Sequence, residues 1–339
     1  MGQRVLVTGG TGFVATWCLV ELLRQGHEVR TTVRDLRRAE AVRAAVVRAG
    51  ADGAALTFAA ADLGDDAGWD AAVAGCDAVL HVASPMGAPA GAAPEALIAP
   101  ARDGTLRVLR AARRAGVSRV VATSSLAAAM PSDPDGTGDE SVWTDPSLPM
   151  LNVYCRSKIF AERAAWDFVR SPEGDGLALT TLLPGAIFGP PLQRAAGSVE
   201  VIQRLLDGRP PLIPRIALTL TDVRDLAAVH VHALSVPEAA GERFVVAGDR
   251  LWMADVARIL REGVGDRAPR IPTRTAPDWL VRAAARFLPP LRELEPLLGR
   301  RMRYASDKAR RVLGYAPRPP EETLGDCARA LLDAADALS

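Results

Sequence analysis

The chain has 339 residues, of which 49% are apolar, and its 41 basic and 40 acidic residues give a net charge of +1. The apolar content is enough for a sizeable core and excludes a disordered chain, while the balanced charge gives no support to binding of nucleic acid or of an anionic membrane. The length fits two domains, or one large α/β domain with an appended lobe.

The first two-thirds of the sequence alternates short apolar runs with longer amphipathic ones. Strands are predicted at residues 5–7, 28–33, 56–58, 78–82, 119–122 and 178–183, and helices at 13–25, 36–48, 95–115 and 153–169. This alternation is typical of a Rossmann-type, doubly wound α/β fold, in which helices cover both faces of a parallel sheet, here of about seven strands.

The C-terminal third differs in composition, because it is rich in prolines that lie between helical segments predicted at 253–262, 279–287 and 321–338. We expect a smaller, mostly helical lobe. Residues 1–185, joined again by 216–235, are expected to form the dinucleotide-binding domain, and residues 186–215 and 236–339 the substrate-binding lobe. The loops at 84–94 and 131–149 are long enough to be functional or to be surface insertions.

A glycine-rich turn joins the first strand to the first helix, at residues 8–15. Gly9 permits the tight turn, Gly12 lets the backbone approach a pyrophosphate at the helix N-terminus, and Ala15 is small enough for close helix–strand packing. The sequence therefore predicts a dinucleotide site. Thr11, Phe13 and Val14 of the same turn are expected to contact the cofactor.

The end of the second strand bears on the choice between NAD and NADP. Arg34 and Arg38 can grip the 2′-phosphate of NADP, whereas Asp35 would bind the ribose hydroxyl of NAD. The net basic neighbourhood favours NADP(H), with NAD(H) as the alternative. After the third strand, Asp62 can accept a hydrogen bond from the adenine amine while Leu63 packs on the ring.

A tyrosine and a lysine, Tyr154 and Lys158, lie one helical turn apart in a chain that has only two lysines. The ammonium is expected to lower the pKa of the phenol, so that Tyr154 can give a proton to a carbonyl oxygen as hydride reaches the carbon. Ser125, after the fifth strand, is expected to bind the developing oxyanion, with Ser124 as the alternative.

These motifs together resemble the extended short-chain dehydrogenase/reductase family. Within that family the similarity is greatest to the dihydroflavonol reductase-like branch, which includes cinnamoyl-CoA reductases and fungal aldehyde and methylglyoxal reductases. The fragments that carry the resemblance lie between residue 4 and about residue 232, and they are VTGGTGFVATW, VRTTVRD, HVASP, TSS, VYCRSKIFAERAAWDF, LLPGAIFGP and DVRDLAAVH.

The resemblance implies an NADPH-dependent carbonyl reductase with a triad of Ser125, Tyr154 and Lys158. It implies further cofactor contacts from Val82, Ala83, Ser84, Thr123, Pro184, Gly185, Ile187 and Ser198, beside Tyr154 and Lys158 themselves. Substrate contacts are expected from Met86, Leu126, Asn152 and Phe188. The surroundings of these residues are mostly apolar, which favours a hydrophobic or aromatic aldehyde or ketone over a sugar nucleotide.

Three alternatives stay open at the level of sequence. One is a nucleotide-sugar epimerase, which would hold NAD tightly beside a polar diphosphate pocket. A second is an enzyme of the 3β-hydroxysteroid dehydrogenase type that runs in the oxidative direction. A third is an NADP-sensing protein without turnover, which the presence of both Tyr154 and Lys158 argues against.

The remaining signals predict little further chemistry. The four cysteines are far apart, which argues against a zinc site or disulfide scaffold and favours a reduced, cytoplasmic protein. No signal peptide is recognised, and no apolar run reaches the about 18 residues of a membrane span. His81 is expected to be a core histidine, and Asp222 and Asp225 to cap the following helix. We expect a small-molecule carbonyl substrate, no metal, no nucleic acid and no membrane partner, and a monomer or homodimer.

Overall fold

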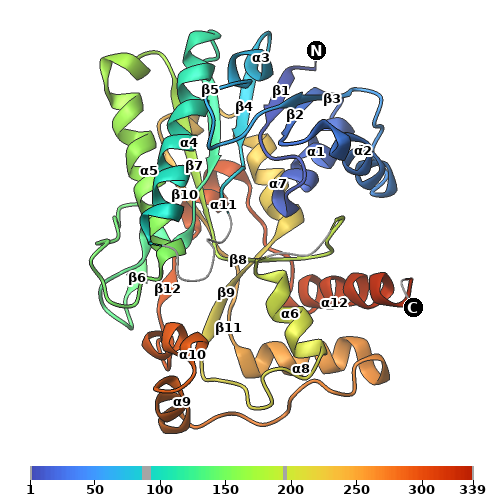
Figure 1. Ribbon diagram of the computed structural model, residues 1–339, viewed down its shortest axis with the longest axis vertical. Coiled ribbons are helices and arrows are strands. Elements are labelled where there is room, and N and C mark those ends of the chain that lie inside the picture. The colour runs from blue at the N-terminus through green and yellow to red at the C-terminus, as the bar shows by residue number, and fades with distance from the viewer. Residues whose placement is uncertain (1, 86–92, 194–196, 338–339) are drawn as a thin grey trace.

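Parallel strands form the central sheet of the computed structural model, which describes residues 2–85, 93–193 and 197–337. The sheet contains β1 (Arg4–Val7), β2 (Glu28–Val33), β3 (Leu56–Ala60), β4 (Ala78–His81), β5 (Arg119–Thr123), β7 (Ala178–Pro184) and β10 (Arg243–Val246). They lie in the order β10–β7–β5–β4–β1–β2–β3 and all neighbours are parallel (Figure 1). The predicted doubly wound α/β sheet is confirmed.

The alternation of side chains along β1 explains why helices cover both faces of the sheet. Val5 and Val7 point into one apolar cluster, and Leu6 points into another on the opposite face. The first cluster is closed by α1 (Phe13–Arg24), α2 (Ala39–Arg48) and α7 (Val223–His232), and the second by α3 (Trp69–Val73), α4 (Glu95–Arg114) and α5 (Val153–Arg170). Strands buried on both faces are mostly apolar, and Val5, Leu6 and Val7 of β1 are fully buried.

The chain changes direction across the sheet between β1 and β4. From β1 it moves outward to β2 and β3, and then it returns to the other side of β1 to build β4, β5, β7 and β10. The loops after β1 and β4 therefore diverge and leave a crevice at the carboxyl edge. Open α/β sheets bind their ligands at such a switch point.

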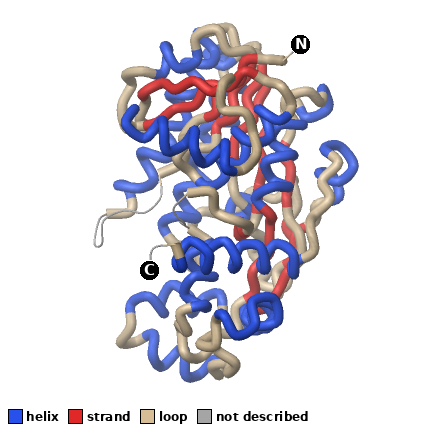
Figure 2. Tube along the Cα trace, turned by 90° about the vertical axis from the view of Figure 1, so that its right-hand side faces the viewer, coloured by secondary structure: helices blue, strands red, loops and turns tan. Residues whose placement is uncertain are grey.

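A smaller lobe lies below the central sheet in both views (Figures 1 and 2). It contains the short sheet β11 (Arg250–Trp252), β9 (Ala217–Asp222) and β8 (Ala186–Phe188), and the helices α6 (Val199–Leu206), α8 (Met253–Val264), α9 (Asp278–Ala285), α10 (Pro289–Leu294) and α12 (Pro320–Asp336). Its own apolar cluster includes Phe188, Ile202, Leu260 and Leu324. Within the three described ranges, no helix is both long and apolar enough to cross a membrane.

Two segments that the sequence assigned to the lobe pack instead with the central sheet. β10 pairs in parallel with β7 and extends the sheet by one strand. After it, α11 (Asp307–Leu313) adds Ala309 and Leu313 to the cluster beneath β1. Both segments fall within the range 236–339, and the buried run of Phe244 and its neighbours lies at the edge of the central sheet.

Part of the long loop at 131–149 is anchored by a pair of short strands. β6 (Thr137–Gly138) pairs with β12 (Arg303–Tyr304). The guanidinium of Arg243 in β10 also holds this loop, because it donates to the carbonyls of Glu140 and Val142 at 2.8 Å each. Most of the other long loop, residues 86–92, lies outside the described residues.

Candidate active site

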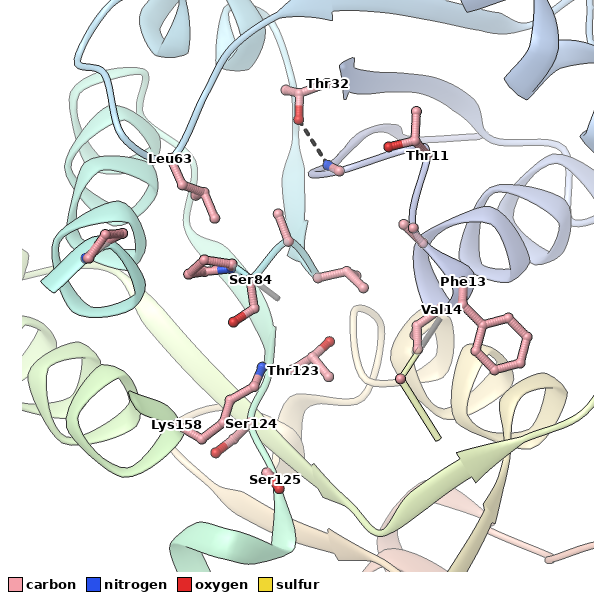
Figure 3. Close-up of a pocket in the computed structure, with 18 of the residues that line it drawn as sticks. Thr11, Phe13, Val14, Thr32, Leu63, Ser84, Thr123, Ser124, Ser125 and Lys158 are labelled. Carbon is pink, nitrogen blue, oxygen red and sulfur yellow. Dashed lines mark hydrogen bonds between the residues drawn. The ribbon is translucent and has the colours of Figure 1, made fainter. Parts of the chain in front are cut away.

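The glycine turn fits closely between β2 and the end of β4. Gly9 has a φ of +75°, and a Cβ atom at this position would lie 2.9 Å from the Cβ of Ala83. The Gly9 amide donates to Oγ1 of Thr32 at 2.9 Å, which is the dashed bond in Figure 3. Only glycine combines this backbone conformation with so close an approach.

The first helix begins with free donors at the mouth of the crevice. Gly12 is the N-cap of α1, and no side chain caps this end of the helix. The first helical amide with an acceptor is that of Thr16, which donates to the Gly12 carbonyl at 2.9 Å. In the described structure the amides of Phe13, Val14 and Ala15 have no partner. These donors and the helix dipole suit an anion such as a pyrophosphate.

A buried histidine supports the backbone opposite the turn. Oγ1 of Thr8 accepts from the amides of Val82 and Ala83 at 3.0 and 2.9 Å, so its own proton goes to Nδ1 of His81 at 3.0 Å. Nε2 of His81 then donates to Oγ1 of Thr105, whose proton goes to the Ala101 carbonyl. Burial lowers the pKa of His81 to about 3, so the ring is neutral.

The cations after β2 differ in what they contact. Arg34 borders the crevice and has no hydrogen-bond or ion-pair partner among the described residues, whereas Arg38 does not border it. The carboxylate of Asp35 caps the next turn by accepting from the amide of Arg37 at 2.9 Å, and the Arg37 guanidinium pairs with it at 2.7 Å. Asp35 is therefore already engaged.

The loop after β3 forms the far end of the crevice. Asp62 and Leu63 both border it, and Oδ1 of Asp62 accepts from the amide of Gly64 at 2.8 Å. Leu63 approaches α4 at Gly104, where a Cβ atom would lie 2.7 Å from that of Leu63. The small residue in α4 thus makes room for the leucine at this end.

Hydroxyl groups line the carboxyl end of β5, and Figure 3 shows Thr123, Ser124 and Ser125 in succession beside Lys158. Ser124 also borders the crevice, but its hydroxyl donates to Oε2 of the buried Glu162. The Ser125 hydroxyl accepts from the amide of Ala127 at 3.2 Å, and no described residue takes its proton. Ser125 is therefore the better placed of the two serines to donate to a ligand oxygen.

The tyrosine and lysine of α5 both border the crevice, and Nζ of Lys158 lies 5.9 Å from the centroid of the Tyr154 ring. Burial raises the pKa of Tyr154 to about 12 and lowers the pKa of Lys158 to about 8. The expected lowering of the tyrosine pKa is wrong for this arrangement. Burial is the largest cause of both shifts, because it disfavours the charged form of each group.

The crevice has a volume of about 640 Å³ and collects most of the predicted cofactor residues. It is bordered by Gly9, Thr11, Gly12, Phe13, Val14, Arg34, Asp62, Leu63, Val82, Ala83, Ser84, Thr123, Ser125, Tyr154, Lys158, Pro184, Gly185, Ile187 and Ser198. Residues that the sequence did not single out also line it, among them Thr32, Trp69 and Pro100. The position of Thr32 near the end of β2 is a signal that could have identified it.

The predicted substrate residues are less well placed. Leu126, Asn152 and Phe188 do not border the crevice, and Met86 lies outside the described residues. Phe188 is fully buried in the apolar cluster of the lobe, because β8 turns this side chain away from the sheet. Asn152 caps α5 by accepting from the amide of Cys155 at 2.9 Å.

Comparison with known proteins adds to this geometry. Residues 5–247 match the model of the NAD dependent epimerase/dehydratase family. Cinnamoyl-CoA reductase 1 from Petunia hybrida is 36% identical over 273 residues, which cover 76% of this chain and 77% of the relative. Ketoreductase azaE from Aspergillus niger is 31% identical over 99% of both chains. The solved structure of yeast methylglyoxal/isovaleraldehyde reductase complexed with NADPH has a TM-score of 0.80 and 26% identity, and covers 98% of this chain and 99% of its own.

Proposed function

Since the chain belongs to the NAD dependent epimerase/dehydratase family, we propose that it is an NADPH-dependent carbonyl reductase that converts an aldehyde or ketone to an alcohol. The family confirms the resemblance found in the motifs. The observation that carries the proposal is the meeting, in one crevice, of the glycine turn, an unpaired arginine and the Ser125, Tyr154 and Lys158 side chains. All three similar proteins are named as reductases, and the structure of one of them is a complex with NADPH.

The choice of NADPH rests on the charges after β2. Arg34 borders the crevice without a partner in the described structure, so its fork of donors is free for a phosphate. Asp35, the residue that would favour NAD, is held by Arg37. The amides at the start of α1 suit the pyrophosphate, and Asp62 and Leu63 suit the adenine.

The chemistry assigned to the chain is proton supply and oxyanion binding. Bound NADPH supplies the hydride that reaches the carbonyl carbon. Tyr154 donates its proton to the carbonyl oxygen, Ser125 donates a hydrogen bond to the same oxygen, and the Lys158 ammonium stabilises the phenolate that Tyr154 becomes. A raised tyrosine pKa keeps the proton in place until the oxygen gains charge.

The substrate we propose is a hydrophobic or aromatic carbonyl compound. Pro184, Gly185 and Ile187 border the crevice, and Leu126, which does not border it, is buried beside Gly185, so this wall is apolar. The names of two similar proteins include cinnamoyl-CoA and isovaleraldehyde, which have an apolar part, beside methylglyoxal, which is small and polar. We place the substrate between this wall and the lobe.

The test is turnover of the purified protein with NADPH, and separately NADH, against aryl ketones, β-keto esters, aliphatic and aromatic aldehydes and a hydroxycinnamoyl-CoA. We expect NADPH-linked reduction of at least one of them. NAD retained through purification would favour the epimerase. Oxidation of a hydroxysteroid without any reduction would favour the dehydrogenase of that type, and NADPH binding without turnover would favour a sensor.

A further inference from the structure

A second, much smaller cavity lies behind Lys158, between the sheet and the helices α4 and α5. Its volume is about 20 Å³, which is enough for a single water molecule. Its polar lining includes His81, Thr105, Glu162 and Thr181. It shares Ser84, Thr123, Ser124 and Lys158 with the crevice. A site of this size with several polar neighbours meets the requirements of a bound water.

Glu162 is the centre of a buried polar network beside this cavity. Its side chain is 1% exposed, and its carboxylate accepts from Nε of Arg243 at 2.9 Å and from the hydroxyls of Ser124 and Thr181. The indole of Trp166 adds a donor at 3.3 Å. The carboxylate is thus paired with one guanidinium and accepts hydrogen bonds from three further side chains.

Lys158 lies on the same helix, one turn before Glu162. It is 7% exposed, and no described residue accepts a hydrogen bond from its ammonium. Burial lowers the pKa of Lys158 to about 8, and the charge of Glu162 opposes this change. The ammonium of Lys158 thus has no acceptor among the described residues, and both Lys158 and Glu162 line the cavity.

The other charges around Glu162 are few. Arg243 from β10 is its direct partner, and Asp139 and Glu140 lie beyond Arg243 in the loop before α5. His81 from β4 borders the cavity but is neutral, as its pKa is lowered to about 3. From β5, β7 and α4 the cavity receives hydroxyl groups and apolar atoms.

We propose that Glu162 is a positioning residue that keeps Lys158 protonated, acting across one water molecule bound in this cavity. The water accepts an N–H from Nζ of Lys158 and donates to the carboxylate of Glu162. This inference deepens the proposed function, because it rests on the role given there to Lys158. Arg243 competes with the lysine for the same carboxylate, so the strand at the edge of the sheet takes part in setting the charge of the active site.

The experiment measures the lysine directly, with isotope-labelled lysine and an NMR titration. The chain has two lysines, and the Lys308→Arg variant assigns the signals. We expect Glu162→Gln to lower the pKa of Lys158 by about one unit or more, and Arg243→Gln to raise it, since one removes an attractive charge and the other a repulsive charge. The titration curve of Lys308, which pairs with Glu242, should be the same in both variants.

The opposite signs separate an electrostatic role from a structural one. Disruption of the core would affect both variants in the same way, so shifts of the same sign, or no shift in Glu162→Gln, would overturn the proposal. If the unpaired Arg243 prevents Glu162→Gln from folding, the double variant Glu162→Gln with Arg243→Gln removes both charges. Its Lys158 pKa should then lie below that of Arg243→Gln alone, and an equal value would contradict the inference.

A third variant tests the water. Ala165 is buried and borders the cavity, so Ala165→Val fills it and should lower the pKa of Lys158 while leaving the Glu162–Arg243 pair intact. Ala164→Val, at a neighbouring position that does not border the cavity, is the matched control. An unchanged pKa in Ala165→Val would exclude the bridging water. The titration needs no turnover, so failure of the reductase assay leaves its result readable.

Discussion

The hydroxyl of Thr123 donates to Nε2 of His230 at 2.7 Å, although the two residues are 107 positions apart in the sequence. His230 can accept this proton because its Nδ1 donates to the carbonyl of Leu226 at 2.8 Å. The ring is fully buried, and burial lowers its pKa to about 4. Thr123 therefore presents lone pairs, and no proton, to the crevice that it borders.

The two buried histidines predict a loss of stability in mild acid. His81 and His230 have folded pKa values of about 3 and about 4, below the ordinary value of 6.5, so the unfolded chain binds protons that the folded one refuses. The contribution of the two histidines to the free energy of unfolding is fully present above pH 6.5 and is lost as the pH drops from there toward 4. Each histidine contributes up to about 1.4 kcal/mol per pH unit.

Urea unfolding between pH 7 and pH 5 measures this slope. The His232→Gln variant removes an exposed histidine and serves as the control, for which the slope should not change. A native protein whose stability is flat between pH 6.5 and 5 would contradict the neutral, buried state of both rings.

Two glycines with the same backbone conformation separate strain from close approach. Gly9 and Gly116 both have φ near +75°, but a Cβ atom at Gly116 meets nothing within 4 Å. Gly116→Ala should cost about 1–2 kcal/mol, the strain of a left-handed residue. Gly9→Ala should cost more and should also weaken NADPH binding, because Ala83 must move. Equal losses of stability and unchanged NADPH affinity would show that the contact with Ala83 is unimportant.

The arginine at the end of β2 is expected to discriminate between the two nicotinamide cofactors. Arg34→Ala should raise the KM for NADPH by about 10- to 100-fold and leave that for NADH nearly unchanged, since a charge-assisted bidentate contact is lost. Steady-state kinetics with both cofactors measure the effect. Arg38→Ala, which changes a residue outside the crevice, is the comparison. An equal effect of Arg38→Ala would spread the phosphate contact over both residues.

Removal of one phenol oxygen should abolish most of the turnover. Tyr154→Phe is expected to lower kcat by about 10²- to 10⁴-fold, because the carbonyl oxygen loses its proton donor, while NADPH affinity, measured by fluorescence titration, is kept. Tyr315→Phe is the matched control, as this buried tyrosine has an unpartnered hydroxyl in the described structure. Retained turnover in Tyr154→Phe would remove the tyrosine from the proposed chemistry.

Local sequence patterns predicted those features that depend on residues close together in the sequence. The β-branched run of β2 and the turn at Gly9 depend on residues close to them, and Glu28–Val33 is the range both predicted and observed. The spacing of Tyr154 and Lys158 likewise survives in any helix. Such features need only the backbone periodicity to be read correctly.

Long-range partners decided what the sequence could not predict. β10 carries Arg243 at its start, and an arginine is buried there only because Glu162 lies 81 positions earlier in the sequence. Phe188 resembles a wall of the substrate site, yet the pairing of β8 with β9 turns it into the core of the lobe. The direction of the Tyr154 pKa also depends on burial, which no local motif reveals.

The position of β10 bears on how the protein can be divided into fragments. A fragment that ends at residue 185 would lack this strand, so β7 would present an open edge and Glu162 would be a buried anion without its guanidinium. The matched family region ends at residue 247, one residue after β10. The central sheet is therefore completed by a strand that follows part of the lobe in the sequence. A fragment that ends before the lobe leaves this sheet incomplete.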